Sequence, residues 1–203
     1  MGPTGAADGV ERICVYCGSN HGRNPAYREA AAALGRTLVE RDLGLVYGGG
    51  DVGLMGTIAD ATLEAGGEVH GVIPGALLER EPTREGLTTL EVVDSMHERK
   101  ARMADLADAF VALPGGFGTL EELMEVLTWA QLGFHGDPCG LLDVAGYYDP
   151  LVAFFDRQVA DGFVSEVHRE MLVVADDADE LLDRFEAYVP PPVERYLAEE
   201  RQT

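Results

Sequence analysis

Short apolar runs alternate with longer amphipathic segments from one end of the chain to the other. The apolar runs have the length and aliphatic character of strands, and they lie at residues 12–17, 44–47, 68–73, 89–93, 109–113, 139–143 and 171–175. The amphipathic segments have helical periodicity and lie at residues 25–41, 54–65, 96–107, 119–132, 150–161 and 178–188. Strands that alternate with helices are typical of a parallel sheet. The pattern therefore predicts an α/β fold, a doubly wound parallel sheet of about seven strands with helices on both faces.

The predicted elements form one domain, because they fill residues 11–189 without a sharp shift in composition. Residues 1–10 precede the first predicted strand, and we expect them to be a flexible N-terminus. Three consecutive prolines end the last predicted helix. We expect residues 190–203 to form a C-terminal arm, either loose or packed on a partner.

Four loops with candidate chemistry directly follow predicted strands. They are residues 17–20 (CGSN), 48–53 (GGGDVG), 74–75 (PG) and 114–119 (PGGFGT). In an open parallel sheet, ligands bind beyond the carboxyl ends of the strands, near a switch in strand order. Glycines let backbone amides approach an anion, and the N-terminus of the following helix attracts it. The loops together predict a site for a nucleotide-sized ligand, with its phosphate at residues 114–119.

Two other nucleotide-binding signatures fit poorly. The loop at residues 48–53 follows the second strand rather than the first, and no acidic residue ends a strand at the distance that an NAD site needs. The P-loop pattern GxxxxGK[ST] does not occur in the sequence. The glycines by themselves are equally well explained by tight turns and close helix packing.

Charged residues near the glycine loop also have ordinary explanations. Residues 119–122 (TLEE) fit a capping box, in which Glu122 reaches back to the helix start, and spacing alone favours this cap over catalysis. Arg99 and Lys100 lie on a segment rich in charge, so periodicity alone favours solvated surface residues. Lys100 is nevertheless the only lysine in the chain.

The formal net charge of −21 disfavours nucleic acid and anionic membranes as partners. A small anion would therefore need a local basic pocket. The chain has 3 cysteines, an odd number that favours a reducing cytoplasm over a disulfide scaffold. Cys14 and Cys17 form a CxxC pattern without a second pair of ligands, so we expect buried structural thiols and no metal site.

Four segments resemble the cytokinin riboside 5'-monophosphate phosphoribohydrolases, the Lonely guy family. They are YGGGDVGLMG at 47–56, MHERKARM at 96–103, PGGFGTLEE at 114–122 and TWAQLG at 128–133. The resemblance runs from the first strand to about Val164. The family was long mislabelled as possible lysine decarboxylases. A pyridoxal phosphate decarboxylase needs a Schiff-base lysine, and the only lysine here lies beside the phosphate loop, which argues against that activity.

The resemblance implies a Rossmann-like fold and a homodimer with sites near the subunit interface. By position in the family's motifs, it implies that Arg99 and Glu122 are the catalytic pair. Its nucleotide-contacting positions are matched by Lys100, Gly115, Gly116, Phe117, Gly118, Thr119, Leu120 and Glu121, and further substrate contacts by Glu81 and Thr128. Loop position and apolar character add four candidate substrate-binding residues, Ser19, Gly49, Gly50 and Met96.

The reaction implied is hydrolysis of the bond between an adenine-type base and ribose 5'-monophosphate, with isopentenyladenosine monophosphate and AMP as candidate substrates. Glu122 would stabilise the oxocarbenium-like charge on the sugar and orient or deprotonate water, while Arg99 acts electrostatically. The reaction calls for no metal or organic cofactor. The alternative is a non-catalytic nucleotide or molybdenum-cofactor carrier, or a nucleotide sensor, which needs the phosphate loop but not the Arg99–Glu122 pair.

Overall fold

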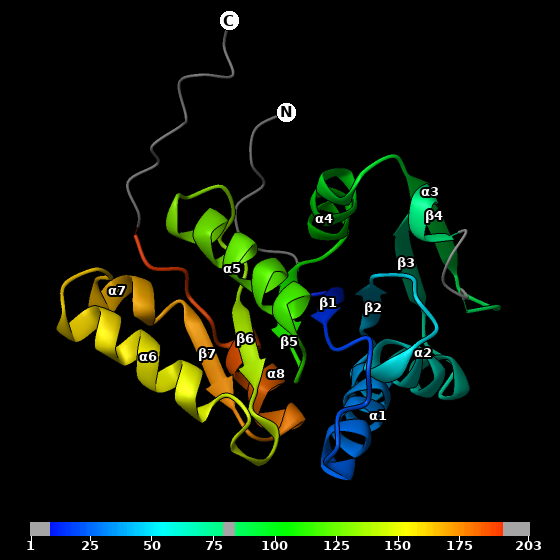
Figure 1. The fold of residues 1–203 in the computed structure, drawn as a ribbon, viewed down its shortest axis with the longest axis horizontal. Coiled ribbons are helices and arrows are strands. Elements are labelled where there is room, and N and C mark those ends of the chain that lie inside the picture. Colours follow the sequence, from blue (N-terminus) through cyan, green and yellow to red (C-terminus); the bar gives the residue numbers. More distant parts are fainter. Residues whose placement is uncertain (1–8, 79–83, 193–203) are drawn as a thin grey trace, which may run out of the picture.

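The protein is described by a computed structural model, which covers residues 9–78 and 84–192. Seven strands form one sheet in the order β4-β3-β2-β1-β5-β6-β7, and every neighbouring pair is parallel (Figure 1). The strands are β1 (Arg12–Tyr16), β2 (Gly44–Tyr47), β3 (Val69–Pro74), β4 (Thr89–Val93), β5 (Ala109–Ala112), β6 (Cys139–Leu142) and β7 (Leu172–Ala175). The predicted strands are confirmed to within two residues at each end.

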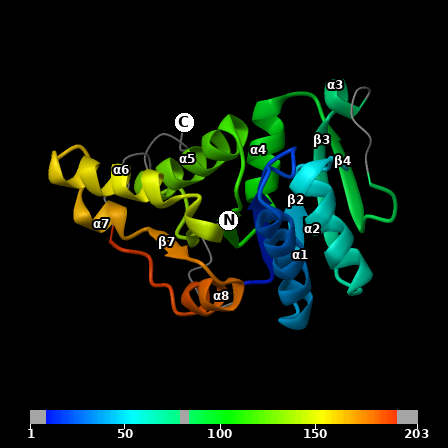
Figure 2. The ribbon, with the colours of Figure 1, turned by 60° about the horizontal axis from the view of Figure 1, so that its bottom comes forward.

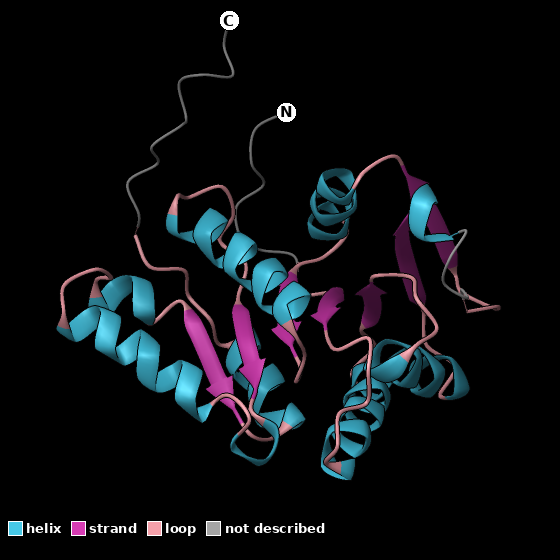
Figure 3. Cartoon of the chain, viewed as in Figure 1, coloured by secondary structure: helices cyan, strands magenta, loops and turns pink. Residues whose placement is uncertain are grey.

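Helices cover both faces of the sheet (Figures 1 and 2), so the doubly wound α/β fold is confirmed. One face carries α1 (Pro25–Glu40), α2 (Gly53–Glu64) and α8 (Ala178–Glu186). The other carries α4 (Met96–Asp105), α5 (Phe117–Gln131), α6 (Asp149–Ala160) and α7 (Glu166–Arg169), while α3 (Gly75–Leu78) follows β3. The single-turn elements α3, α7 and η1 (Val144–Gly146) were not predicted, because a single turn shows no periodicity (Figure 3). None of the described helices is long and apolar enough to cross a membrane.

Alternate side chains of β1 enter the two halves of the core. Ile13 and Val15 pack on the α1–α2–α8 side, whereas Cys14 and Tyr16 pack on the α4–α5 side. Cys17 belongs to the same cluster as Ile13, so the two thiols of the CxxC pattern lie in different clusters. All three cysteines are free and buried, as the sequence predicts.

The order of the strands reverses between β1 and β5, and the loops after these strands meet there. The Gly18 amide in the loop after β1 donates to the Pro114 carbonyl after β5 at 3.1 Å. The loop after β2 joins them, because the Leu54 amide donates to the Gly18 carbonyl at 2.9 Å. Gly53 has a φ of 58°, and a Cβ there would lie 2.3 Å from the carbonyl carbon of Ser19, so this contact requires a glycine. The loop after β1 therefore contacts two of the other predicted ligand loops, those after β2 and β5.

Two predicted segments fall largely outside the described residues. Residues 1–8 of the expected N-terminus and residues 193–203 of the expected C-terminal arm are not described, and neither is Glu81. Residues 190–192, at the start of that arm, have no regular secondary structure.

Candidate active site

The glycine loop after β5 leads directly into the N-terminus of α5. The helix begins at Phe117 with Gly116 as its N-cap, and no side chain caps it. The free amides of this first turn and the positive end of the helix dipole favour an anion. Gly115 is a close-packing position, because a Cβ there would lie 2.1 Å from the buried hydroxyl of Thr119. The predicted phosphate loop thus has the backbone geometry that anion binding needs.

The capping-box interpretation of Glu122 is wrong. It requires Thr119 to be the N-cap, but α5 begins two residues before Thr119. Glu122 is the sixth residue of the helix, too far along to bond to the amides at its start. Gly116 has the extended backbone of an N-cap, so the cap lies three residues before the position that the capping box assumes. The Glu122 carboxylate is therefore available for another partner.

Arg99, on α4, lies where it can pair with the Glu122 carboxylate. Ser95 caps this helix, its hydroxyl oxygen accepting from the Glu98 amide at 3.1 Å. Arg99 then lies against the sheet, where Nε donates to the Val72 carbonyl and Nη2 to the Gly48 carbonyl, both at 3.2 Å. Arg99 is 9% exposed, so the expectation from periodicity of a solvated surface residue is wrong.

Arg99 and Glu122 form a buried ion pair. Nη1 of Arg99 lies 3.5 Å from Oε1 of Glu122, and only 10% and 11% of the two side chains are exposed. Burial raises the pKa of the Glu122 carboxyl, while the positive charge of Arg99 opposes that rise. A carboxylate in this setting is little solvated and well oriented. It can stabilise a nearby cation or accept a proton from water.

Lys100 is buried as well, and it pairs with two carboxylates of α5. Nζ contacts Glu121, and it lies 3.0 Å from Oε1 of Glu125. Burial lowers the pKa of Lys100, but the hydrogen bonds to the two glutamates outweigh this, and the pKa is raised above its ordinary value. A Schiff-base lysine must lose its proton to attack a carbonyl, so this charged, paired amine is unsuited to lysine decarboxylation. A phosphate that binds Lys100 would have to compete with Glu121 and Glu125.

The remaining candidates near the loops differ in exposure. Ser19 is exposed after β1, and Gly50 is buried after β2. Gly49 has a φ of 77° and packs closely on Ile73, so a glycine is needed there for the backbone conformation and the close packing. Met96 is 44% exposed and its sulfur lies 3.9 Å from Nη1 of Arg99. Gly118 and Leu120 belong to the first turn of α5, where Phe117 is 94% exposed.

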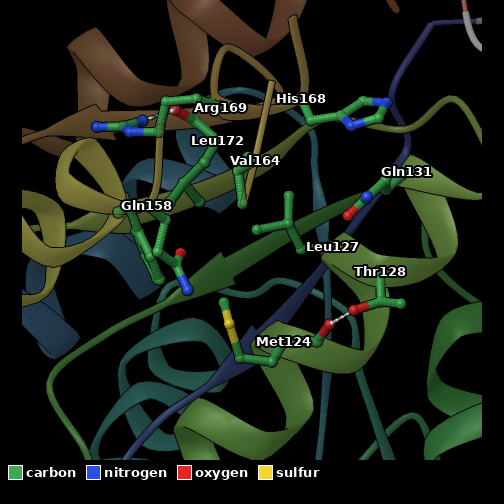
Figure 4. A pocket seen from close by; sticks show the side chains of 10 residues that line it. Met124, Leu127, Thr128, Gln131, Gln158, Val164, His168, Arg169 and Leu172 are labelled. Carbon is green, nitrogen blue, oxygen red and sulfur yellow. Dashed lines mark hydrogen bonds between the residues drawn. The ribbon is translucent and has the colours of Figure 1, made fainter. Parts of the chain in front are cut away.

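Thr128 lies apart from the residues at the glycine loop. It lines a groove with a volume of about 110 Å³ between α5, α6 and α7, together with Leu127, Gln158 and His168 (Figure 4). Its hydroxyl donates to the Met124 carbonyl of its own helix at 2.6 Å. Arg99, Lys100 and Glu122 are not among the residues that line this groove. Within one chain, the structure therefore brings together Arg99, Lys100, Glu121 and Glu122 at the glycine loop, and leaves Thr128 apart.

Three residues at the site were missed from the sequence. The Gly48 carbonyl accepts from Arg99. The Tyr147 hydroxyl donates to the Gly115 carbonyl, and the Tyr148 hydroxyl donates to the Leu113 carbonyl just before the glycine loop. Gly48 belongs to a loop that was considered, but only Gly49 and Gly50 were singled out. The tyrosines follow the sixth strand, so their position at the carboxyl end of a strand was the signal available.

The fold has close structural relatives. The molybdenum cofactor carrier protein of Chlamydomonas reinhardtii matches with a TM-score of 0.67 at 22% identity, over 88% of this chain and 99% of that one. The molybdenum cofactor binding protein of Rippkaea orientalis matches with a TM-score of 0.66 at 17% identity, over 87% of this chain and 96% of that one. Likeness at this level of identity shows the shared fold alone.

Sequence relatives are much closer. Residues 55–185 match the family described as "Possible lysine decarboxylase". The cytokinin riboside 5'-monophosphate phosphoribohydrolase LOG of Oryza sativa is 55% identical, over 88% of this chain and 74% of the rice protein. The enzyme LOG7 of Arabidopsis thaliana is 54% identical, over 89% of this chain and 83% of its own length. The chain therefore belongs to the Lonely guy family of cytokinin riboside 5'-monophosphate phosphoribohydrolases, the family whose description still carries the lysine decarboxylase label.

Proposed function

We propose that this protein hydrolyses the N-glycosidic bond of adenosine 5'-monophosphates, including isopentenyladenosine 5'-monophosphate and AMP, and releases the free base and ribose 5-phosphate. The observation that carries the proposal is the buried Arg99–Glu122 pair, at 3.5 Å, in which Glu122 belongs to the helix that begins at the glycine loop. The names of the rice and Arabidopsis relatives support the same reaction.

The 5'-phosphate binds at the N-terminus of α5 in this proposal. The amides of Gly115, Gly116, Gly118 and Thr119 supply donors there, and the helix dipole adds favourable electrostatics. Ser19 is exposed on the adjoining loop and can add a hydroxyl donor. Because this interaction fixes the sugar relative to Glu122, nucleosides that lack the phosphate should be poor substrates.

The chemical step breaks the bond between the anomeric carbon and the base nitrogen. The sugar acquires oxocarbenium-like positive charge, which the Glu122 carboxylate stabilises. Glu122 also orients water and takes its proton, while the hydroxide adds to the anomeric carbon. The base leaves with the bonding electron pair and takes up a proton from solvent, and Glu122 releases the proton that it took from water, so the carboxylate is restored. Arg99 remains protonated, so it serves to hold Glu122 and the substrate electrostatically rather than to donate a proton.

The carrier alternative accounts for the fold but not for this pair of side chains. A carrier requires an anion site and has no need for a buried carboxylate held by an arginine. Burying two charges is costly unless they are paired. Burial raises the pKa of Glu122 although Arg99 opposes the rise, as suits a group that handles protons. The pair therefore favours the hydrolase.

We also propose that the protein acts as a homodimer in the cytoplasm. Phe154, Phe163 and Val167 are exposed and precede in sequence the groove-lining residues 155, 164 and 168, so we infer that a second copy covers this side of the molecule. In such a dimer, Thr128 of one copy would lie near the active site of the other copy. The free thiols of the three cysteines suit a reducing compartment.

The substrate proposal is tested by chromatography of reactions with AMP, isopentenyladenosine 5'-monophosphate and the two corresponding nucleosides. Release of base and ribose 5-phosphate from the monophosphates alone is the expected result, and the relative rates identify the preferred base. Tight nucleotide binding without base release would instead favour the carrier or the sensor.

A further inference from the structure

Three consecutive carbonyl groups between β5 and α5, those of residues 113–115, accept hydrogen bonds from other parts of the chain. The Leu113 carbonyl accepts from the Tyr148 hydroxyl at 2.7 Å. The Pro114 carbonyl accepts from the Gly18 amide at 3.1 Å, and the Gly115 carbonyl accepts from the Tyr147 hydroxyl. The segment between β5 and α5 is thus fixed at every peptide before the helix.

Both tyrosines come from the connection between β6 and α6, and both are held in place. The Tyr148 amide donates to Oδ1 of Asp143 at 2.6 Å, and its ring is buried. The Tyr147 ring packs edge-on against Tyr148, with ring centres 4.9 Å apart, and against Tyr27 of α1 at 5.4 Å. Tyr147 remains 39% exposed, but its ring is held on two sides, so its hydroxyl can set the direction of the carbonyl that it contacts.

The direction of each carbonyl fixes the direction of the next amide. In a trans peptide the C=O and the N–H point in opposite directions, and the described part of the chain contains no cis peptide. The bond from Tyr147 to the Gly115 carbonyl therefore turns the Gly116 N–H away from the tyrosine cluster. The bond from Tyr148 orients no amide, because Leu113 is followed by proline.

The Gly115 and Gly116 amides are the groups left over by this arrangement. Among the described residues, neither amide donates to a backbone or side-chain acceptor. An oriented amide without an internal partner at a helix N-terminus is a donor prepared for an anion. Tyr147 lies outside the loop, yet its hydroxyl bonds to the carbonyl of the peptide that carries one of these donors, the Gly116 amide.

We propose that Tyr147 is a positioning residue for phosphate binding, which acts through the Gly115 carbonyl to aim the Gly116 amide at the 5'-phosphate. The proposal rests on the function proposed above, since it assigns the phosphate to this loop. Loss of the Tyr147 hydroxyl frees the peptide to rotate, and the phosphate must then restore its orientation on binding. The effect should appear in affinity for phosphate-bearing ligands more than in the chemical step.

The test compares Tyr147→Phe with Tyr27→Phe, which alters the same ring cluster without touching the loop carbonyls. Binding of ribose 5-phosphate, which cannot be hydrolysed, is measured by calorimetry, and kcat and KM are measured with AMP. We expect Tyr147→Phe to weaken ribose 5-phosphate binding and raise KM roughly three- to tenfold, with little change in kcat or melting temperature. Tyr27→Phe should match the wild type.

Two results would overturn the proposal. One is an unchanged dissociation constant in Tyr147→Phe, and the other is an equal loss in both variants. The proposed function is judged separately. A wild type that cleaves AMP while Tyr147→Phe binds normally refutes only the positioning role. A wild type that binds ribose 5-phosphate without cleaving AMP, together with weakened binding in Tyr147→Phe, refutes only the hydrolase.

Discussion

The guanidinium of Arg99 fills the space that a side chain at Gly48 would need. A Cβ on Gly48 would lie 1.7 Å from Nη2 of Arg99, the same nitrogen that donates to the Gly48 carbonyl at 3.2 Å. The glycine therefore does two things for the site. It supplies an acceptor that orients Arg99 and leaves the room in which the guanidinium lies beside Glu122.

Gly48→Ala is expected to displace Arg99 and lower kcat by a factor on the order of 10 to 100, because the arginine can no longer hold Glu122 in place. Steady-state kinetics measures the effect. Gly75→Ala is the control, since a Cβ there meets its nearest neighbour, Cγ1 of Val92, at an ordinary 3.7 Å. Equal activities of the two variants would contradict the positioning of Arg99 by Gly48.

Arg99→Lys is expected to lower kcat/KM by a factor on the order of 100. A lysine keeps the charge but cannot donate in a fork to the Val72 and Gly48 carbonyls while facing Glu122. Arg102→Lys on the same helix is the matched control, because Arg102 is partly exposed and pairs with Glu91 at 2.7 Å. If both variants retain near-wild-type kcat/KM, charge alone suffices and the geometric role of Arg99 is refuted.

The pH profile of kcat/KM should report the ionisation of Glu122. Burial raises the pKa of this carboxyl. The pH at which activity is lost on the acid side should therefore lie above about 4.3, the ordinary pKa of glutamate. Arg99 opposes the rise, and removing its charge in Arg99→Met should move the acid limb to higher pH. An acid limb that stays in place in Arg99→Met would show that another group controls it.

Thr128→Arg is expected to convert the proposed homodimer into a monomer. Thr128 is exposed in the groove, and a charged side chain there would oppose the burial of an apolar face. Light scattering after size-exclusion chromatography measures the mass. Thr89→Arg on the edge strand β4 serves as the control, because Thr89 is also exposed. A wild-type monomer, or a Thr128→Arg dimer, would rule out this face as the interface.

The strands were predictable because a parallel sheet covered on both faces needs continuous apolar runs, and those runs are visible in the sequence. The start of α5 was not, because a capping box at Thr119 and a glycine N-cap at Gly116 differ by backbone conformation rather than by residue pattern. The burial of Arg99 was also hidden from periodicity. Its acceptors are Val72 and Gly48, which lie 27 and 51 residues away in the chain.

Resemblance to the family supplied the pairing of Arg99 with Glu122, and the structure supplied the reason why the two meet. Helix α4 leads into β5 and α5 follows it, so the two side chains come together at the carboxyl end of the sheet. For Tyr147 the only signal was its place after the sixth strand, because its hydroxyl bonds to a carbonyl 32 residues earlier in the chain. Contacts to backbone atoms leave little trace in residue identity.

The most direct measurement is single-turnover base release from AMP by Glu122→Gln, paired with its AMP affinity. The account predicts binding within a few-fold of the wild type and release slower by a factor on the order of 100 to 10,000. Base release at the wild-type rate by folded Glu122→Gln would contradict the account.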